Sequence, residues 1–382
     1  MSARRTARVS ESGSAQQKRA QWSTQAYKVD ELLSQFSLPQ IVKCQPLSIL
    51  VKRDSSSMPV NLGQPILLFE SRAVRKLLAR NVVLDPLTGR FTENDDTVTI
   101  PNDYEGSFLR LRSRTSKDHT THKTIESLAN IKAFLNLSKM AAYRMVNPHN
   151  GVGEYPRLDY LPGNVFAVDT LLTGSAKLKQ DGKFLVHKNS SSKDMKILKC
   201  RDDKDNPIIM PLSQSGEFVE IIPNDLNGSN RLSVNSAELV EKQTFPIVVR
   251  YIRGPFKPRL KSFTGLFTLL DSFEENTIVG CVLDKNGYTF MELPVCSPLT
   301  FHLALNFTEL QGHPMVKNAL RLCDTNGHNF ARDLKFKFKF AQRTEQPETP
   351  DKPPDEADDP GESPSARNSI KGFGVTSTYI YI

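Results

Sequence analysis

One cysteine, Cys200, lies between two basic residues, Lys199 and Arg201. Nearby positive charge lowers the pKa of a thiol and favours the thiolate, which is the nucleophile in cysteine chemistry. A catalytic thiol also needs a partner base, and no such partner is evident around this position. In a strand over residues 196–200, Leu198 and Cys200 share one face. We therefore predict that Cys200 packs in the core and reacts slowly.

Metal binding is the second chemistry that the cysteines could support. The chain has five cysteines, an odd number without a CxxC pair, which argues against a disulfide framework and indicates a reducing compartment. A zinc site would have to bridge irregular gaps among Cys281, Cys296, His302, Cys323 and His328. We expect no metal site and no cofactor.

Enzyme signatures are missing from the sequence. It contains no P-loop, GxGxxG, GxSxG or HExxH motif. Without such a motif or a nucleophile with its base, we expect a protein without catalytic activity.

Peptide recognition is indicated more clearly. Pro347, Pro350 and Lys352 match the PxxPx[K/R] pattern of an SH3 ligand, in which prolines favour the extended polyproline II conformation. Tyr379 and Tyr381 stand near the last residue, where we expect them to be exposed, as kinase targets or as part of a PDZ-type ligand. Ser10, in Arg8-Val9-Ser10, resembles a site for a basophilic kinase.

The charge is divided unevenly. Residues 345–362 hold eight acids and one lysine, so the rest of the chain carries about +15 although the whole has a formal net charge of +8. A basic body is compatible with nucleic acid as an alternative partner, as is the alternating run 335–340, KFKFKF. In a strand, however, the phenylalanines would face opposite to the lysines, which favours a half-buried strand with a solvated lysine face.

Composition divides the chain into a body and two tails. Residues 1–26 are basic and poor in apolar side chains, and residues 342–382 are acidic and Pro-rich, so we expect both to be disordered. The body, 27–341, is predicted to be mostly β, in two related barrel or sandwich halves at about 27–150 and 151–341. Short apolar runs between breakers predict strands at 40–43, 47–52, 65–70, 82–84, 97–100, 108–111, 165–168, 183–187, 196–200, 207–210, 218–222, 246–251 and 278–283.

Two helices are expected within this β body. Apolar residues recur at roughly helical intervals from about 124 to 145, and a second, shorter helix is predicted over 236–242. No apolar run is long enough to cross a membrane as a helix.

A short pattern occurs twice, 110 residues apart, and indicates a structural duplication. Pro101, Gly106 and Phe108 have the same spacing as Pro211, Gly216 and Phe218. We expect proline to end a strand, glycine to adopt a positive φ in the turn, and phenylalanine to face the core on the returning strand. Pro294 and Phe301 repeat the spacing without the glycine.

These turns, together with Cys200 and the start at Leu38-Pro39, resemble the CABIT domain of Themis-like and GAREM-like signalling proteins over about residues 27–340. The resemblance implies a cytoplasmic scaffold, which could also enter the nucleus, acting downstream of tyrosine kinases. Its expected partners are SH3-domain adaptors, recruited through the Pro-rich tail, and an SH2-containing tyrosine phosphatase, bound by the module itself. The sequence lacks a Tyr-x-Asn motif for SH2 recruitment of the adaptor.

Overall fold

A computed structural model describes most of the body of the protein. The described residues are 19–45, 50–51, 60–113, 121–145, 155–174, 179–180, 183–184, 195–224, 231–242, 244–255, 260, 262–284, 287–343 and 375–382.

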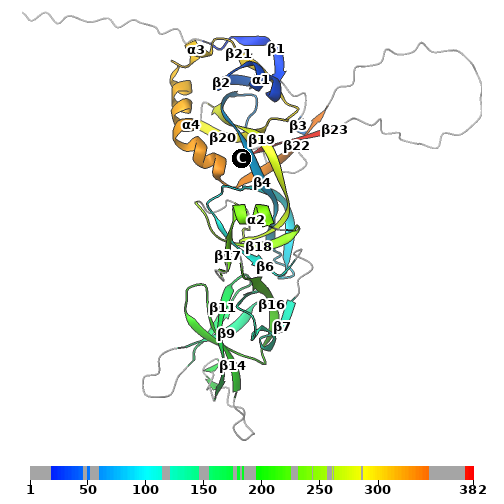
Figure 1. Cartoon of the computed structure of the whole chain (residues 1–382), viewed down its shortest axis with the longest axis vertical. Coiled ribbons are helices and arrows are strands. Elements are labelled where there is room, and N and C mark those ends of the chain that lie inside the picture. Colours follow the sequence, from blue (N-terminus) through cyan, green and yellow to red (C-terminus); the bar gives the residue numbers. More distant parts are fainter. Residues whose placement is uncertain are drawn as a thin grey trace, which may run out of the picture. The chain divides into compact units, whose positions relative to one another are not determined.

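Strands dominate the described residues, which confirms the mostly β prediction (Figure 1). The strands are β1 (Trp22–Lys28), β2 (Gln40–Cys44), β3 (Leu50–Val51), β4 (Pro65–Leu84), β5 (Phe91–Pro101), β6 (Ser107–Leu111), β7 (Thr121–Thr124), β8 (Ala133–Asn136), β9 (Met140–Arg144), β10 (Arg157–Tyr160), β11 (Val165–Gly174), β12 (Lys179–Gln180), β13 (Lys183–Phe184), β14 (Met195–Arg201), β15 (Pro207–Pro211), β16 (Ser215–Ile222), β17 (Ser233–Asn235), β18 (Ile247–Arg253), β19 (Leu266–Asp284), β20 (Gly287–Pro294), β21 (Thr300–Ala304), β22 (Lys335–Arg343) and β23 (Val375–Tyr381). The helices are α1 (Val29–Gln35), η1 (Glu126–Leu128), α2 (Ser236–Lys242), α3 (Phe307–Leu310) and α4 (Pro314–Arg332).

The chain forms two compact units that are interleaved along the sequence. Unit 1 is made of the described residues within 1–72, 276–331 and 339–382, and unit 2 of those within 73–275 and 332–338. Two of the boundaries between them lie within the long strands β4 and β19, and another lies within β22. Each unit therefore needs segments that are distant in the sequence.

Unit 1 is a set of antiparallel strands with helix α4 packed on its core. Strand β2 pairs with the first part of β4 on one side and with β21 on the other, and β21 also pairs with β1. Helix α4 buries Val316, Ala319 and Cys323 in a cluster with Leu67 and Cys281. Their spacing of three or four residues, after proline at the first helical position, is the pattern of a core-facing helix.

Strand β6 is central to unit 2, where it pairs with β16, β17 and β18. Because side chains alternate along a strand, Phe108 enters one core cluster and Leu109 the opposite one. We call the first the Phe108 cluster; it includes Tyr104, Val249 and Phe267. A further group, the Phe218 cluster, lies among β8, β9, β11 and β14–β16 and contains Phe134, Phe166, Cys200 and Phe218.

The helix predicted over 124–145 is wrong. This segment contains the end of β7, the single turn η1, and strands β8 and β9. All four residues of β8 are buried, with Ala133 and Leu135 in the cluster that contains Leu109 and with Phe134 in the Phe218 cluster. A strand buried on both faces has a continuous apolar run, which periodicity cannot distinguish from a buried helix. The short helix predicted over 236–242 is confirmed as α2.

Both predicted tails extend too far into the chain. Strand β1 begins at Trp22, within the predicted tail 1–26, and pairs with β21. At the other end, β23 pairs with β20 through Tyr381 and Glu292, so residues 375–381 form a strand. Residues 1–18 and 344–374 lie outside the described part of the chain.

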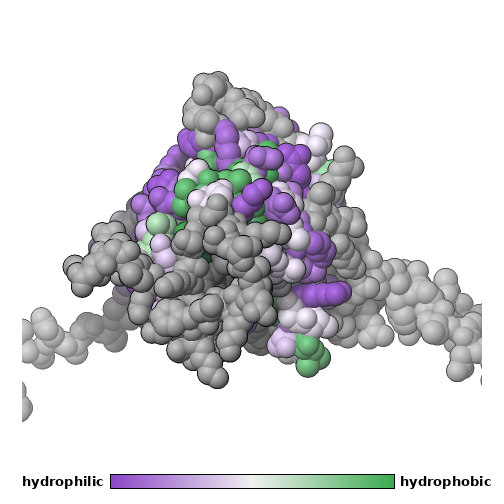
Figure 2. All heavy atoms as spheres, turned by 90° about the horizontal axis from the view of Figure 1, so that it is seen from below, coloured by the Kyte–Doolittle hydropathy of each residue, from purple (hydrophilic) through white to green (hydrophobic). Residues whose placement is uncertain are grey.

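Hydrophilic side chains predominate among the described residues on the face of the molecule that Figure 2 shows. Figure 2 shows purple side chains around a small green area on one face. The large apolar side chains that are exposed, Leu87, Leu161, Leu171, Ile252 and Leu305, belong to separate segments. Single exposed apolar residues are ordinary on a globular protein and define no docking surface by themselves.

Candidate functional site

The repeated motif forms the same turn at each of its occurrences. The backbone N–H of Tyr104 donates to the carbonyl of Pro101, and that of Gln214 donates to Pro211, both at 3.1 Å. The third occurrence has the same bond, from Ser297 to Pro294 at 3.0 Å. The returning strands bury Phe108, Phe218 and Phe301 completely. Strand, turn and buried phenylalanine are thus shared, also by the occurrence that lacks glycine.

The glycines have a different role from the one expected. Neither Gly106 nor Gly216 has a positive φ. Instead, a Cβ at Gly106 would lie 2.0 Å from the Tyr104 ring, and a Cβ at Gly216 would lie 2.4 Å from the Phe218 ring. Glycine is required because an aromatic ring occupies the space beside the backbone.

Cys200 is fully buried in the Phe218 cluster, as predicted. Burial raises the pKa of its thiol to about 12, and the negative charge of Asp169 contributes in the same direction. The flanking Arg201 is engaged outside the core by Asp169 and Asp205. The basic neighbours in the sequence therefore do not produce a reactive thiolate.

We expect Cys200 to be alkylated slowly in the native protein at pH 8, because the thiolate is scarce and the sulfur is covered. Cys296, which is exposed, is the internal control and should react fast. Mass spectrometry after iodoacetamide treatment measures both sites in one sample. In denaturant the two rates should converge; native labelling of Cys200 as fast as Cys296 would contradict the prediction.

The residues considered for zinc are dispersed or already paired. Cys281 and Cys323 share the core of unit 1, where the hydrogen bond between their thiols lowers the pKa of Cys281 and raises that of Cys323. The His302 Nδ1 lies 2.8 Å from the backbone oxygen of Ser23. Among the described residues, no three His, Cys, Asp or Glu side chains form a group suited to a metal ion.

The predicted docking residues fall largely outside the described chain. Pro347, Pro350, Lys352 and Ser10 all belong to segments without described structure. Tyr379 is part of β23. The expectation that Tyr381 is exposed is wrong, because its side chain is fully buried and its strand pairs with β20.

The KFKFKF strand also differs in part from the prediction. Phe336 in β22 and Leu334 just before it pack against the Phe108 cluster, as expected for the apolar side chains of this segment. Lys335 is not solvated: it is buried, and its ammonium donates to the backbone oxygen of Asp333 at 3.0 Å.

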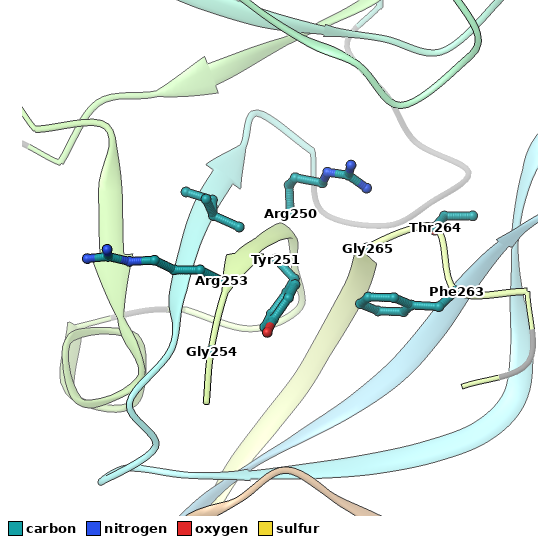
Figure 3. Close-up of a pocket in the computed structure, with 8 residues that line it drawn as sticks. Arg250, Tyr251, Arg253, Gly254, Phe263, Thr264 and Gly265 are labelled. Carbon is teal, nitrogen blue, oxygen red and sulfur yellow. The ribbon is translucent and has the colours of Figure 1, made fainter. Parts of the chain in front are cut away.

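A pocket of about 430 Å³ opens in unit 2 beside the end of β18 (Figure 3). Its lining is Arg250, Tyr251, Ile252, Arg253, Gly254, Phe263, Thr264 and Gly265, with no acidic residue among them. Tyr251 packs edge-on against Phe263, with ring centroids 5.7 Å apart. Figure 3 shows the Arg250 guanidinium on the side of β18 opposite to these rings. The sequence did not single out this pocket, although the density of cations in 250–261 was a usable signal.

Comparison with protein-family models identifies the chain. Residues 38–316 match the CABIT family, described as "Cell-cycle sustaining, positive selection". The match covers most of the sequence, and the protein belongs to the CABIT family, a signalling-related domain family. Comparison with curated proteins and with solved structures gave no significant match. None of the helices in the described part of the chain has the length and apolar character needed to cross a membrane.

Proposed function

We propose that this protein is a non-catalytic cytoplasmic scaffold in tyrosine-kinase receptor signalling, which binds SH3-containing adaptors and an SH2-containing tyrosine phosphatase. The observation that carries the proposal is the match of residues 38–316 to the CABIT family. The core position of Cys200 supports a structural role for the cysteine most suggestive of catalysis.

The Pro-rich segment is the proposed docking point for the adaptor. Pro347 and Pro350 would occupy the aromatic-lined slots of an SH3 groove, and Lys352 would meet its acidic pocket. A segment already biased to polyproline II loses little entropy on binding, which compensates for a small contact area. Asp351 and Glu356 oppose the contact, so binding should be weak and should strengthen as salt screens them.

We expect a peptide covering 343–364 to bind the SH3 domain of a growth-factor-receptor adaptor, and Pro350→Ala and Lys352→Glu peptides to bind at least about tenfold more weakly. Titration of the labelled peptides measures all three affinities. Pro360→Ala is the matched control, because it removes a proline outside the motif. Equal binding by all peptides, or none at millimolar concentration, would exclude the tail from the mechanism.

Nucleic-acid binding is the alternative, and the basic charge of the body favours it. Base stacking needs aromatic rings exposed beside the positive charge. Phe336 packs against the Phe108 cluster instead, which argues against β22 as a stacking surface. A pull-down from lysate, with and without phosphatase inhibition, separates the two: adaptors and phosphatases support the scaffold, whereas nuclease-sensitive ribonucleoproteins support the alternative.

A further inference from the structure

The pocket beside β18 is lined by a cation, Arg250, whose hydrogen-bonding capacity is not fully used. The Arg250 Nη1 atom is buried, yet it has no hydrogen-bond partner. Burial lowers the pKa of Arg250, and the negative charge of Asp203 opposes this shift. A buried N–H group of a guanidinium is costly unless an acceptor meets it. Arg250 also lines the pocket, so an anion bound there would supply the missing acceptor after a rearrangement of the guanidinium.

The backbone around Arg250 is arranged to admit the guanidinium. The N–H of Tyr251 donates to the carbonyl of Gly265 at 2.7 Å, which fixes the turn before β19 against β18. Gly265 has φ +82°, and a Cβ there would lie 2.3 Å from Arg250 Nη1. Only glycine combines this backbone conformation with room for the guanidinium. The position of the Arg250 guanidinium thus depends on glycine at position 265.

The side chains that line the pocket carry net positive charge, which would attract an anion. The pocket lining includes Arg253 and no acidic residue. Figure 3 shows Arg253 pointing away from Arg250, so it can add to the positive potential without sharing the same contact.

One hydroxyl group that lines the pocket, that of Thr264, is already hydrogen-bonded within the protein. The Thr264 hydroxyl donates to the carbonyl of Val82 and accepts from the N–H of Leu266, so its proton is already engaged. The contact to an anion must then come mainly from the guanidinium, whose planar fork matches two oxygens of one phosphate group.

We propose that this pocket binds a phosphate group, with Arg250 as its main donor, carried either by a free phosphorylated small molecule or by a phosphorylated peptide. This goes beyond the scaffold function, which relies on other residues. The pocket is large enough for a phosphate and part of the group that carries it.

The test uses the full chain and inorganic phosphate as the probe, with chloride replacing phosphate at constant ionic strength. Calorimetric titration should detect binding to the wild type, and the melting temperature should rise with phosphate because a ligand of the native state stabilises it. Arg250→Leu should weaken binding roughly tenfold or more and abolish the thermal shift, since it removes a charge-assisted bond. Arg250→Lys keeps the charge but not the planar guanidinium. Its phosphate affinity should lie between that of the wild type and that of Arg250→Leu.

Arg90→Leu is the matched control, since it removes one exposed positive charge in the β4–β5 connection and should bind phosphate as the wild type does. An unliganded Arg250→Leu variant should melt no lower than the wild type, because it removes a buried N–H without a partner. A phosphotyrosine peptide that binds at least tenfold more tightly than phosphate would identify a peptide as the source; equal affinity would indicate a small molecule. Absence of phosphate binding to the wild type, or wild-type binding by Arg250→Leu, would overturn the proposal.

Discussion

Replacing Phe218 with alanine is expected to lower the free energy of unfolding by about 3–5 kcal/mol, as for other large buried aromatic residues. Its ring is fully buried and packs against Phe134 with centroids 5.5 Å apart. Phe108→Ala should cost a similar amount, because Phe108 has the same place after the turn in its own cluster. Denaturant-induced unfolding of the full chain, followed by circular dichroism, measures both losses.

Leu87→Ala provides the comparison for the two phenylalanine variants. Leu87 is 94% exposed, so its truncation should change stability by less than about 0.5 kcal/mol. If either phenylalanine variant were as stable as Leu87→Ala, that turn would not anchor its cluster, and the equivalence of the repeated motifs would fail.

Lys76→Met is expected to destabilise the protein by about 3–5 kcal/mol, the usual cost of removing one member of a buried ion pair. The Lys76 ammonium lies 2.9 Å from the Glu275 carboxylate, and the two side chains are 1% and 6% exposed. The substitution preserves most of the side-chain volume, so the loss comes from a buried carboxylate that no longer contacts this ammonium. Thermal and denaturant unfolding measure it.

A double variant and an exposed ion pair serve as controls that test whether the loss of stability comes from burial of the Lys76–Glu275 pair. Lys76→Met combined with Glu275→Leu removes both charges and should be clearly more stable than Lys76→Met alone. Lys123→Met breaks a pair of similar length, 2.7 Å to Glu217, whose side chains are 63% and 40% exposed, and should cost no more than about 1 kcal/mol. A loss for Lys76→Met as small as for Lys123→Met would show that burial does not matter here.

The strand content could be predicted from the sequence because most strands are apolar runs ended by breakers, but their lengths could not. Residues 65–70 and 82–84 were predicted as separate strands, whereas β4 is continuous from Pro65 to Leu84. The intervening charged residues suggested a loop, yet Lys76 is buried there by its pairing with Glu275. A long-range ion pair has no local signature in the sequence.

The candidate sites show the same limit. The burial of Cys200 followed from strand alternation, and the turns followed from their repeated spacing. The pocket at Arg250 depends on the approach of Gly265, which is brought beside it only when β18 pairs with β19. Likewise, the burial of Tyr381 requires strand β20, about 90 residues earlier.

The interleaving of the two units has a consequence for synthesis on the ribosome. Strands β1 and β2 both pair with β21. The ribosome makes about 200 residues of unit 2 after β1 and β2 and before β21. Synthesis proceeds at about 5–20 residues per second, so β1 and β2 remain without β21 for roughly 10–40 s after they are made. During this interval Val42 lacks its β21 partner Leu303, and Ile41 lacks core neighbours such as Cys281 and Ala304, although both can already pair with β4. Nascent chains halted before residue 300 should therefore engage chaperones through their first 72 residues, whereas chains released after residue 331 should not.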